Sequence, residues 1–223
     1  MGVEIEERLK EVLATLPEGV ELVAVSKFHP EEDILRAYRQ GQRVFGESRE
    51  QELSRKQAVL PKDIRWHFIG HLQTNKVKYI APYISFIEAV DSLKLLREIN
   101  RQALKCDRRI DVLLELHLAA EETKSGLTLD ECRALLDGGE WKEMEGVRIC
   151  GLMMMASLTD DKEQIRREMT SAADFFDEVN ARYFADAEYF NRRSWGMSDD
   201  YEIALQCKSN MVRIGTKIFG TRQ

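Results

Sequence analysis

Apolar residues along the chain fall into short runs that alternate with longer amphipathic stretches. Residues 20–26 (VELVAVS) are rich in β-branched side chains and too few for a helix, which predicts a strand. Residues 30–40 begin with a proline and three acids, which predicts a helix start. This pairing of a strand with a helix recurs along almost the whole chain.

Further strands are predicted at 43–46, 66–70, 84–89, 111–118, 147–155, 188–191 and 211–214. Helices are predicted between them at 47–60, up to about 80, 92–104, 129–136, 160–184 and 198–207. The strand at 188–191 has the weakest pattern, because the adjoining residues NRRSW are polar where a barrel strand should be apolar.

Eight strand candidates alternating with helices predict an α/β fold, a single (β/α)₈ TIM barrel, with residues 1–223 as one domain. An open doubly wound sheet is the alternative. In such a barrel the active face lies at the C-terminal ends of the strands, and phosphate commonly binds at the loops after strands seven and eight.

Composition excludes several classes of function. The formal net charge of −6 comes without a clustered basic segment, which argues against nucleic-acid binding. No apolar run approaches membrane-spanning length and the N-terminus is not signal-like, so we expect a cytoplasmic protein with no membrane contact. The four cysteines lack metal-site spacing, and we expect reduced thiols and no metal.

A closed barrel has no free strand edges, which favours a monomer.

Lys27 lies where the first predicted strand ends and the next helix is about to begin. Its even-numbered separation from Val23 and Val25 places it on their face of the strand, a candidate for the barrel interior. The alternative is an ordinary solvated loop lysine.

Two glycine-containing segments follow the seventh and eighth predicted strands. Gly196 and Ser198 lie in SWGMS, and Gly215 and Thr216 lie in RIGT. Glycines let the backbone approach an anion closely, and a helix start supplies free N–H donors. The Ser and Thr hydroxyls add hydrogen-bond donors, so the two loops together suit one phosphate. Alternatively, Ser198 is a plain helix cap and Gly215 a turn residue. Arg213 lies on an apolar strand, where an inward guanidinium needs a partner.

A lysine, a phosphate cradle and an arginine at one barrel mouth suggest pyridoxal 5′-phosphate (PLP), an aldehyde that carries a phosphate. The Lys27 amine would form a Schiff base with it, helped by desolvation that lowers the lysine pKa.

Seven segments resemble, in order, motifs of one family: AVSK (24–27), FGES (45–48), HFIGHLQTNK (67–76), ETKSGL (122–127), GLMMMA (151–156), SWGMS (194–198) and MVRIGTKIFG (211–220). The family is that of the pyridoxal phosphate homeostasis proteins, which is related to the barrel domain of fold-type III PLP enzymes such as alanine racemase.

The resemblance implies that Lys27 carries the cofactor as its internal aldimine. It implies that Ser198, Gly215 and Thr216 hold the phosphate. It also implies that Arg213 faces the pyridine nitrogen, which disfavours ring protonation and weakens the cofactor as an electron sink.

The resemblance further implies that Met155 and Ala156 line the pocket, with His67 nearby. A hydrogen-bonded core histidine is the alternative for His67.

Several positions depart from the family pattern. Ser48 replaces an asparagine, Trp195 replaces a methionine, and Arg192 and Arg193 stand where the family strand is mostly apolar. Residues 208–210 (KSN) replace Gly-Ser-Thr, and a left-handed residue at 208 would cost about 1 kcal/mol.

Racemases of this fold type use a second base, a tyrosine from a C-terminal β domain of the partner subunit. The sequence ends three residues after Gly220, so we expect no such domain. The resemblance therefore implies a PLP-binding protein of intracellular PLP homeostasis and amino-acid and keto-acid balance. It implies no robust catalytic activity and no assigned catalytic residue, and PLP-dependent apoenzymes are candidate recipients of the cofactor.

Two alternatives remain open. The first is a PLP-dependent amino-acid racemase that works through Lys27 and a base of its own. The second is an aldolase in which Lys27 forms a Schiff base with a phosphorylated sugar.

Overall fold

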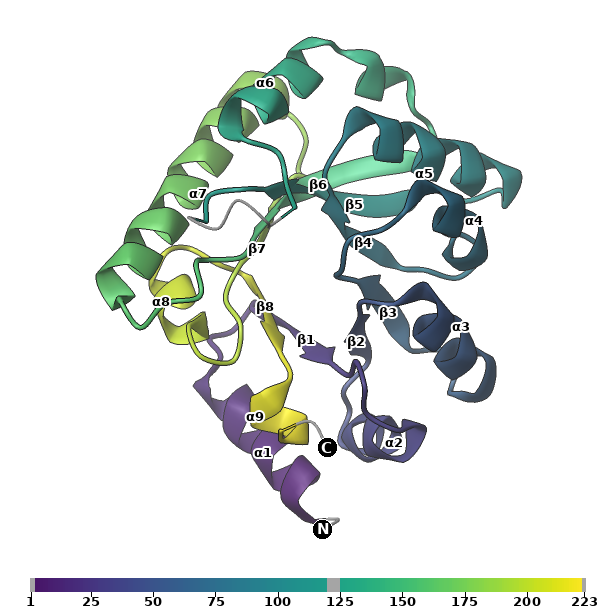
Figure 1. Cartoon of the computed structure of the whole chain (residues 1–223), viewed down its shortest axis with the longest axis vertical. Coiled ribbons are helices and arrows are strands. Elements are labelled where there is room, and N and C mark those ends of the chain that lie inside the picture. Colours follow the sequence, from purple (N-terminus) through teal and green to yellow (C-terminus); the bar gives the residue numbers. More distant parts are fainter. Residues whose placement is uncertain (1–2, 120–124, 222–223) are drawn as a thin grey trace.

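A closed barrel of eight parallel strands forms the centre of the molecule, and helices surround it (Figure 1). The computed structural model describes residues 3–119 and 125–221. The strands are β1 (Glu21–Val25), β2 (Val44–Glu47), β3 (Arg65–Phe68), β4 (Phe86–Val90), β5 (Ile110–Leu116), β6 (Val147–Met154), β7 (Arg192–Ser194) and β8 (Met211–Ile214). Each pairs with its neighbours in sequence and β8 pairs with β1, so the predicted barrel is confirmed and the open sheet is wrong.

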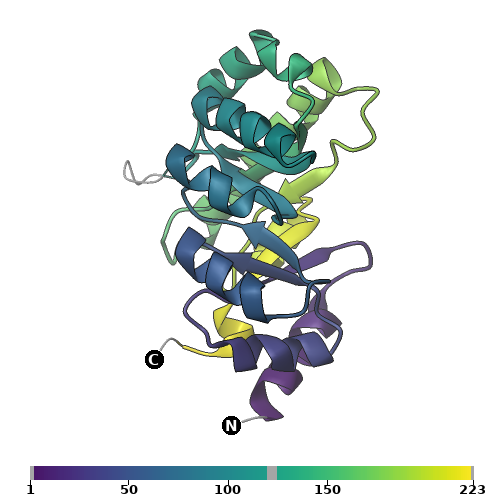
Figure 2. The same cartoon turned by 90° about the vertical axis from the view of Figure 1, so that its right-hand side faces the viewer.

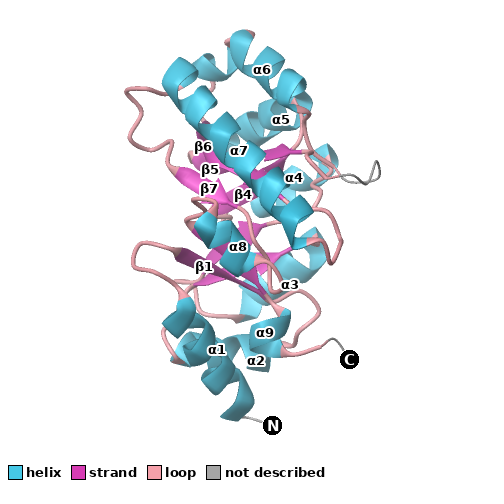
Figure 3. Ribbon diagram, turned by 90° about the vertical axis from the view of Figure 1, so that its left-hand side faces the viewer, coloured by secondary structure: helices cyan, strands magenta, loops and turns pink. Residues whose placement is uncertain are grey.

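Helices lie in the connections between strands, before β1 and after β8, and they cover the barrel on both sides seen in Figures 2 and 3. They are α1 (Val3–Thr15), α2 (Glu31–Arg39), α3 (Glu50–Val59), α4 (Val77–Ile80), α5 (Leu93–Lys105), α6 (Leu129–Asp137), α7 (Lys162–Tyr183), α8 (Tyr201–Gln206) and α9 (Thr216–Phe219), with 3₁₀ turns η1 (Thr74–Lys76) and η2 (Glu140–Glu143). The predicted long helix is therefore present as α7. No helix within the described residues combines the length and apolar character that crossing a membrane requires.

Buried apolar side chains form two clusters, one on each face of the sheet. The larger contains helix residues together with strand residues such as Ala24 and Phe45, so it fills the layer between barrel and helices. The smaller contains strand residues such as Val23, Val44 and Met211, which therefore face the barrel interior. Alternation along β1 and β2 thus sends neighbouring residues to opposite sides of the sheet.

The seventh strand lies later in the chain than predicted. Residues 188–191 form a turn, where the buried ring of Phe190 stacks on Phe184 with centroids 4.1 Å apart. The strand itself is Arg192–Ser194, and its two arginines have partners on opposite sides of the sheet. Arg192 lies 3.8 Å from a carboxylate oxygen of Glu21, and the Arg193 guanidinium lies over the ring of Phe176.

Lys208 has a φ of 63°, so it does adopt the left-handed conformation whose cost was considered above. The ETKSGL segment is described only in part, because residues 120–124 lie outside the described residues.

Gly151 in β6 is required by close approach of the next strand. A Cβ atom there would lie 1.8 Å from the backbone oxygen of Arg192 in β7. We predict that Gly151→Ala lowers the free energy of unfolding by about 3 kcal/mol, since the two strands must move apart. Urea denaturation measures this. Gly138→Ala is the control, because its Cβ would make contacts of 3.4 Å in a right-handed helical conformation; an equal loss in both variants would contradict the steric explanation.

Candidate functional site

Pairing of the first and last strands brings Lys27 to the same stretch of rim as Gly215. The rim is the ring of loops at the C-terminal ends of the strands. Val23 of β1 is paired with Arg213 of β8, and half-buried Lys27 follows two residues after β1 ends. A Cβ atom at Gly215 would lie 3.0 Å from the backbone oxygen of Val25, a tight contact that glycine avoids where the loop after β8 approaches β1.

Ser198 and Gly215, from the loops after β7 and β8, lie within hydrogen-bonding distance of each other. The Ser198 hydroxyl accepts a hydrogen bond of 3.2 Å from the Gly215 N–H. The predicted helix start at Ser198 is wrong: α8 begins at Tyr201, and Asp200 occupies the preceding position. Ser198 is therefore not a helix cap, and its hydroxyl is directed to the neighbouring loop instead. Thr216 follows as the exposed first residue of α9.

Gly196 lets the loop after β7 pack tightly on α8. Its φ is 94°, and a Cβ atom there would lie 2.5 Å from the Ala204 side chain. Its carbonyl oxygen accepts a hydrogen bond of 3.0 Å from the Arg213 N–H. Gly196 therefore positions Ser198 and ties this loop to β8.

The Arg213 side chain is buried inside the barrel, with 3% of its surface exposed. Its guanidinium donates to the backbone oxygen and hydroxyl of Ser194, at 2.8 and 2.5 Å, and to the Met154 backbone oxygen at 2.8 Å. Ser194 in turn donates to Glu88 at 2.6 Å. His67 Nδ1 lies 2.7 Å from the other oxygen of Glu88. These four buried side chains form one continuous chain of hydrogen bonds, and His67 is a partnered interior residue of it.

The positive and negative charges within this hydrogen-bond network balance each other. Burial alone would raise the pKa of Glu88, but its contacts with His67, Arg213 and Ser194 outweigh burial and leave that pKa below its usual value. Burial lowers the pKa of Arg213, while Glu88 opposes that change. Because a guanidinium keeps its proton in proteins, Arg213 and Glu88 lie inside the barrel as a cation and an anion.

Glu115 of β5 is a further carboxyl group in this interior. It is 1% exposed, accepts a hydrogen bond from Ser125 and has one oxygen without a hydrogen-bond partner among the described residues. Burial raises its pKa. Sequence reasoning missed Glu88, Glu115 and Ser194; the available signal was an acid inside each of the apolar runs FIEAV and VLLEL.

Met155 and Ala156 line a hollow of about 600 Å³ between the loops after β6 and β7, which Met197 and Asp200 also line. Ser48 lines a different hollow, of about 250 Å³, with His71 on the opposite part of the rim. Met155 and Ala156 therefore line one hollow and Ser48 another, while the other predicted site residues line neither of the two.

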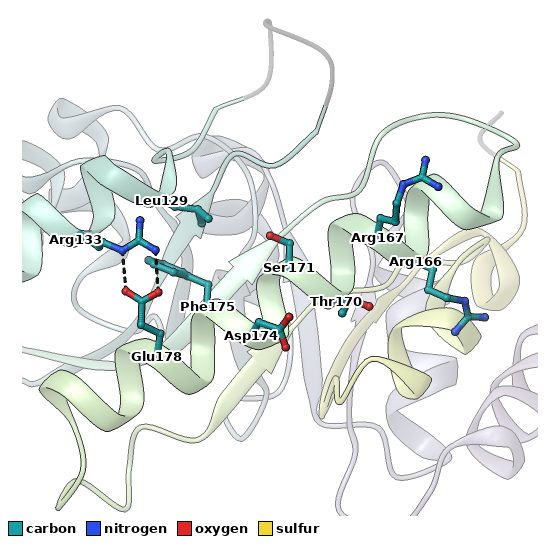
Figure 4. Close-up of a pocket in the computed structure, with 9 residues that line it drawn as sticks. All are labelled: Leu129, Arg133, Arg166, Arg167, Thr170, Ser171, Asp174, Phe175 and Glu178. Carbon is teal, nitrogen blue, oxygen red and sulfur yellow. Dashed lines mark hydrogen bonds and ion pairs between the residues drawn. The ribbon is translucent and has the colours of Figure 1, made fainter.

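A third hollow, of about 540 Å³, lies outside the barrel between α6 and α7 (Figure 4). Arg133 there forms an ion pair of 2.7 Å with Glu178 and stacks over Phe175. None of the predicted site residues lines this hollow, so the barrel mouth is the candidate site.

Comparison with known proteins identifies the family. The family model described as alanine racemase, N-terminal domain, matches residues 3–223. The pyridoxal phosphate homeostasis protein of Aquifex aeolicus is 34% identical over 97% of this chain and 98% of its own. The corresponding Pasteurella multocida protein is 36% identical over 94% of this chain and 90% of its own. This chain belongs to the pyridoxal phosphate homeostasis protein family.

Solved structures agree with this family assignment. PipY of Synechococcus elongatus with PLP bound is 33% identical, with a TM-score of 0.87 over 97% of this chain and 100% of its own. An alanine racemase of Streptomyces coelicolor has a TM-score of 0.76 over 99% of this chain and 58% of its own, at 14% identity. That second likeness shows the fold alone.

Buried Glu115 predicts a pH-dependent change in stability. Because burial raises its pKa, the wild-type protein is destabilised at neutral pH and loses that destabilisation as pH falls through the raised pKa. We predict that Glu115→Gln raises the free energy of unfolding at pH 7 by on the order of 1 kcal/mol.

The measurement is urea denaturation across pH. The gain should shrink toward the pH at which an ordinary glutamate is protonated. A gain that stays constant over this range would show that the carboxyl group is not the cause.

Proposed function

We propose that this chain binds PLP covalently through Lys27 at the barrel mouth and acts in intracellular PLP homeostasis. The observation that carries the proposal is the meeting of the Ser198 hydroxyl with the Gly215 N–H beside the strand that ends at Lys27. Relatives that match nearly the whole chain are pyridoxal phosphate homeostasis proteins, and the PipY structure contains PLP.

The residues at the mouth suit the chemical groups of PLP. The Ser198 hydroxyl, which accepts from the Gly215 N–H, keeps its own O–H to donate to a phosphate, and Thr216 lies beside it with a second hydroxyl. Arg213 offers a fixed cation toward the pyridine nitrogen. We assign Met155, Ala156 and Gly196 to the walls of the same site and Ser48 to its far edge.

The cofactor, when bound, supplies an aldehyde that condenses with an amine and releases water. The amine is assigned to Lys27 because it lies at the rim and half-buried. Lys56 is the competing buried amine, but it donates hydrogen bonds to Ser26, Glu47 and Glu52 and has no lone pair to offer.

A carrier role fits these residues better than racemisation. Arg213 would keep the ring nitrogen unprotonated, which weakens carbanion stabilisation. The likeness to alanine racemases, at 14% identity, carries only the fold. The single domain of residues 1–223, the monomeric state, the cytoplasmic location and transfer to PLP-dependent apoenzymes stay predictions.

We predict that Lys27→Ala abolishes the borohydride-reducible PLP adduct and leaves the fold intact, since a half-buried rim residue leaves no core cavity. The measurement is peptide mass mapping after incubation with PLP and borohydride, which also tests the phosphosugar alternative when the sugar replaces PLP. Lys76→Ala is the control, because Lys76 is also a half-buried lysine, paired with Glu50. An adduct that persists in Lys27→Ala would show that another lysine carries the cofactor.

A further inference from the structure

The turn that contains Lys27 is held from outside the barrel by helix α3. The backbone oxygen of Ser26 accepts a hydrogen bond of 2.8 Å from Lys56. The backbone N–H of Phe28 donates a hydrogen bond of 2.7 Å to Glu52. The peptide groups immediately before and after Lys27 are therefore both fixed by side chains of one helix, one turn apart.

Lys56 lies in the layer between the sheet and the helices. Ser26 and Glu47 continue the outward-facing alternation of Ala24 and Phe45, and all four are fully buried. The Lys56 ammonium, also fully buried, donates to Glu47 at 2.8 Å and to Glu52 at 2.7 Å, in addition to Ser26. All three of its protons are used, so the ammonium is fixed in position.

The turn itself has a conformation that side chains disfavour. Phe28 has φ of 69°, in the left-handed region that residues with a Cβ atom rarely adopt. Phe28 is 45% exposed, with the Arg49 guanidinium 4.7 Å from its ring centroid, so burial contributes little to holding its backbone there. The Glu52 hydrogen bond acts directly on the strained residue.

A buried ion pair of this kind is a poor source of stability. Desolvation of two charges offsets most of their attraction, and well-packed apolar residues commonly do as well. Burial raises the pKa of Glu47, and one of its oxygens has no partner among the described residues. The arrangement is better explained by what it positions.

We infer that Glu52 and Lys56 are positioning residues that fix the backbone on both sides of Lys27, so that the lysine amine meets the aldehyde of bound PLP. This inference rests on the proposed function. The inference goes beyond the proposed function because it predicts that residues outside the barrel, without contact to the cofactor, set how readily Lys27 reacts.

Glu52→Ala is the informative variant. Lys56→Met would be less informative, because it would leave the buried Glu47 carboxylate without its cation. Glu52 has 14% of its side chain exposed, and alanine is well suited to a helix, so its replacement disturbs the fold less. With PLP as the probe, we expect Glu52→Ala to form the Lys27 adduct about tenfold more slowly and to bind PLP about tenfold more weakly. The far-ultraviolet spectrum should stay close to wild type. The melting temperature of the cofactor-free protein should fall modestly, because the variant removes one of the three acceptors of the buried Lys56 ammonium.

Two rescue variants separate positioning from general stability. Glu52→Gln keeps an oxygen that accepts from the Phe28 N–H, so it should react nearly as wild type. Phe28→Gly combined with Glu52→Ala should recover most of the lost rate, because glycine takes a positive φ without strain. Lys208→Met is the matched control. Lys208 also has a positive φ and forms an ion pair of 2.7 Å with Asp177, but it precedes β8 at the other end of the barrel.

The outcomes are distinct. Wild-type kinetics in Glu52→Ala, an equal loss in Lys208→Met, or failure of both rescue variants would each overturn the positioning role. If the wild-type protein itself forms no adduct at Lys27, the proposed function fails and this inference fails with it.

Discussion

The site depends on the closure of the barrel between its last and first strands. Arg213 of β8 is in register with Val23 of β1, so the residues that follow both strands share one stretch of rim. The approach is close enough that a Cβ atom at position 215 would lie 3.0 Å from the Val25 backbone oxygen. Lys27 and Gly215 are therefore adjacent only when the whole chain has folded, because the two strands lie at opposite ends of the sequence.

Charged groups occupy both faces of the sheet at the level of the strand ends. Inside the barrel, Glu88 links His67 and Arg213 through Ser194. Outside, Lys56 links two neighbouring strand ends to α3. Buried charges add little stability and require partners with fixed geometry. Their presence near the strand ends is better explained by the fixed geometry that they give to the rim than by added stability.

Much of the fold was predictable because parallel barrel strands are short apolar runs separated by amphipathic helices. The pattern failed at β7, where Arg192 and Arg193 look unsuited to a strand. Their partners, Glu21 and Asp177, come from distant segments, and no local pattern reveals them. At the candidate site, the motifs pointed to Lys27 and Gly215, which follow β1 and β8, and to Arg213, which lies inside the barrel. Glu88 was missed because its role is visible only once its strand neighbours are known.

Ser198 illustrates why motif and structure must be combined. Its place in SWGMS allowed two interpretations, a helix cap or a ligand for an anion. The helix begins three residues later, at Tyr201, and the hydroxyl instead meets the N–H of Gly215. The barrel is shared with alanine racemases at 14% identity, so the fold by itself does not choose between a carrier and an enzyme. That choice depends on the few side chains at the strand ends and on what holds them, including residues of α3 on the far side of the sheet.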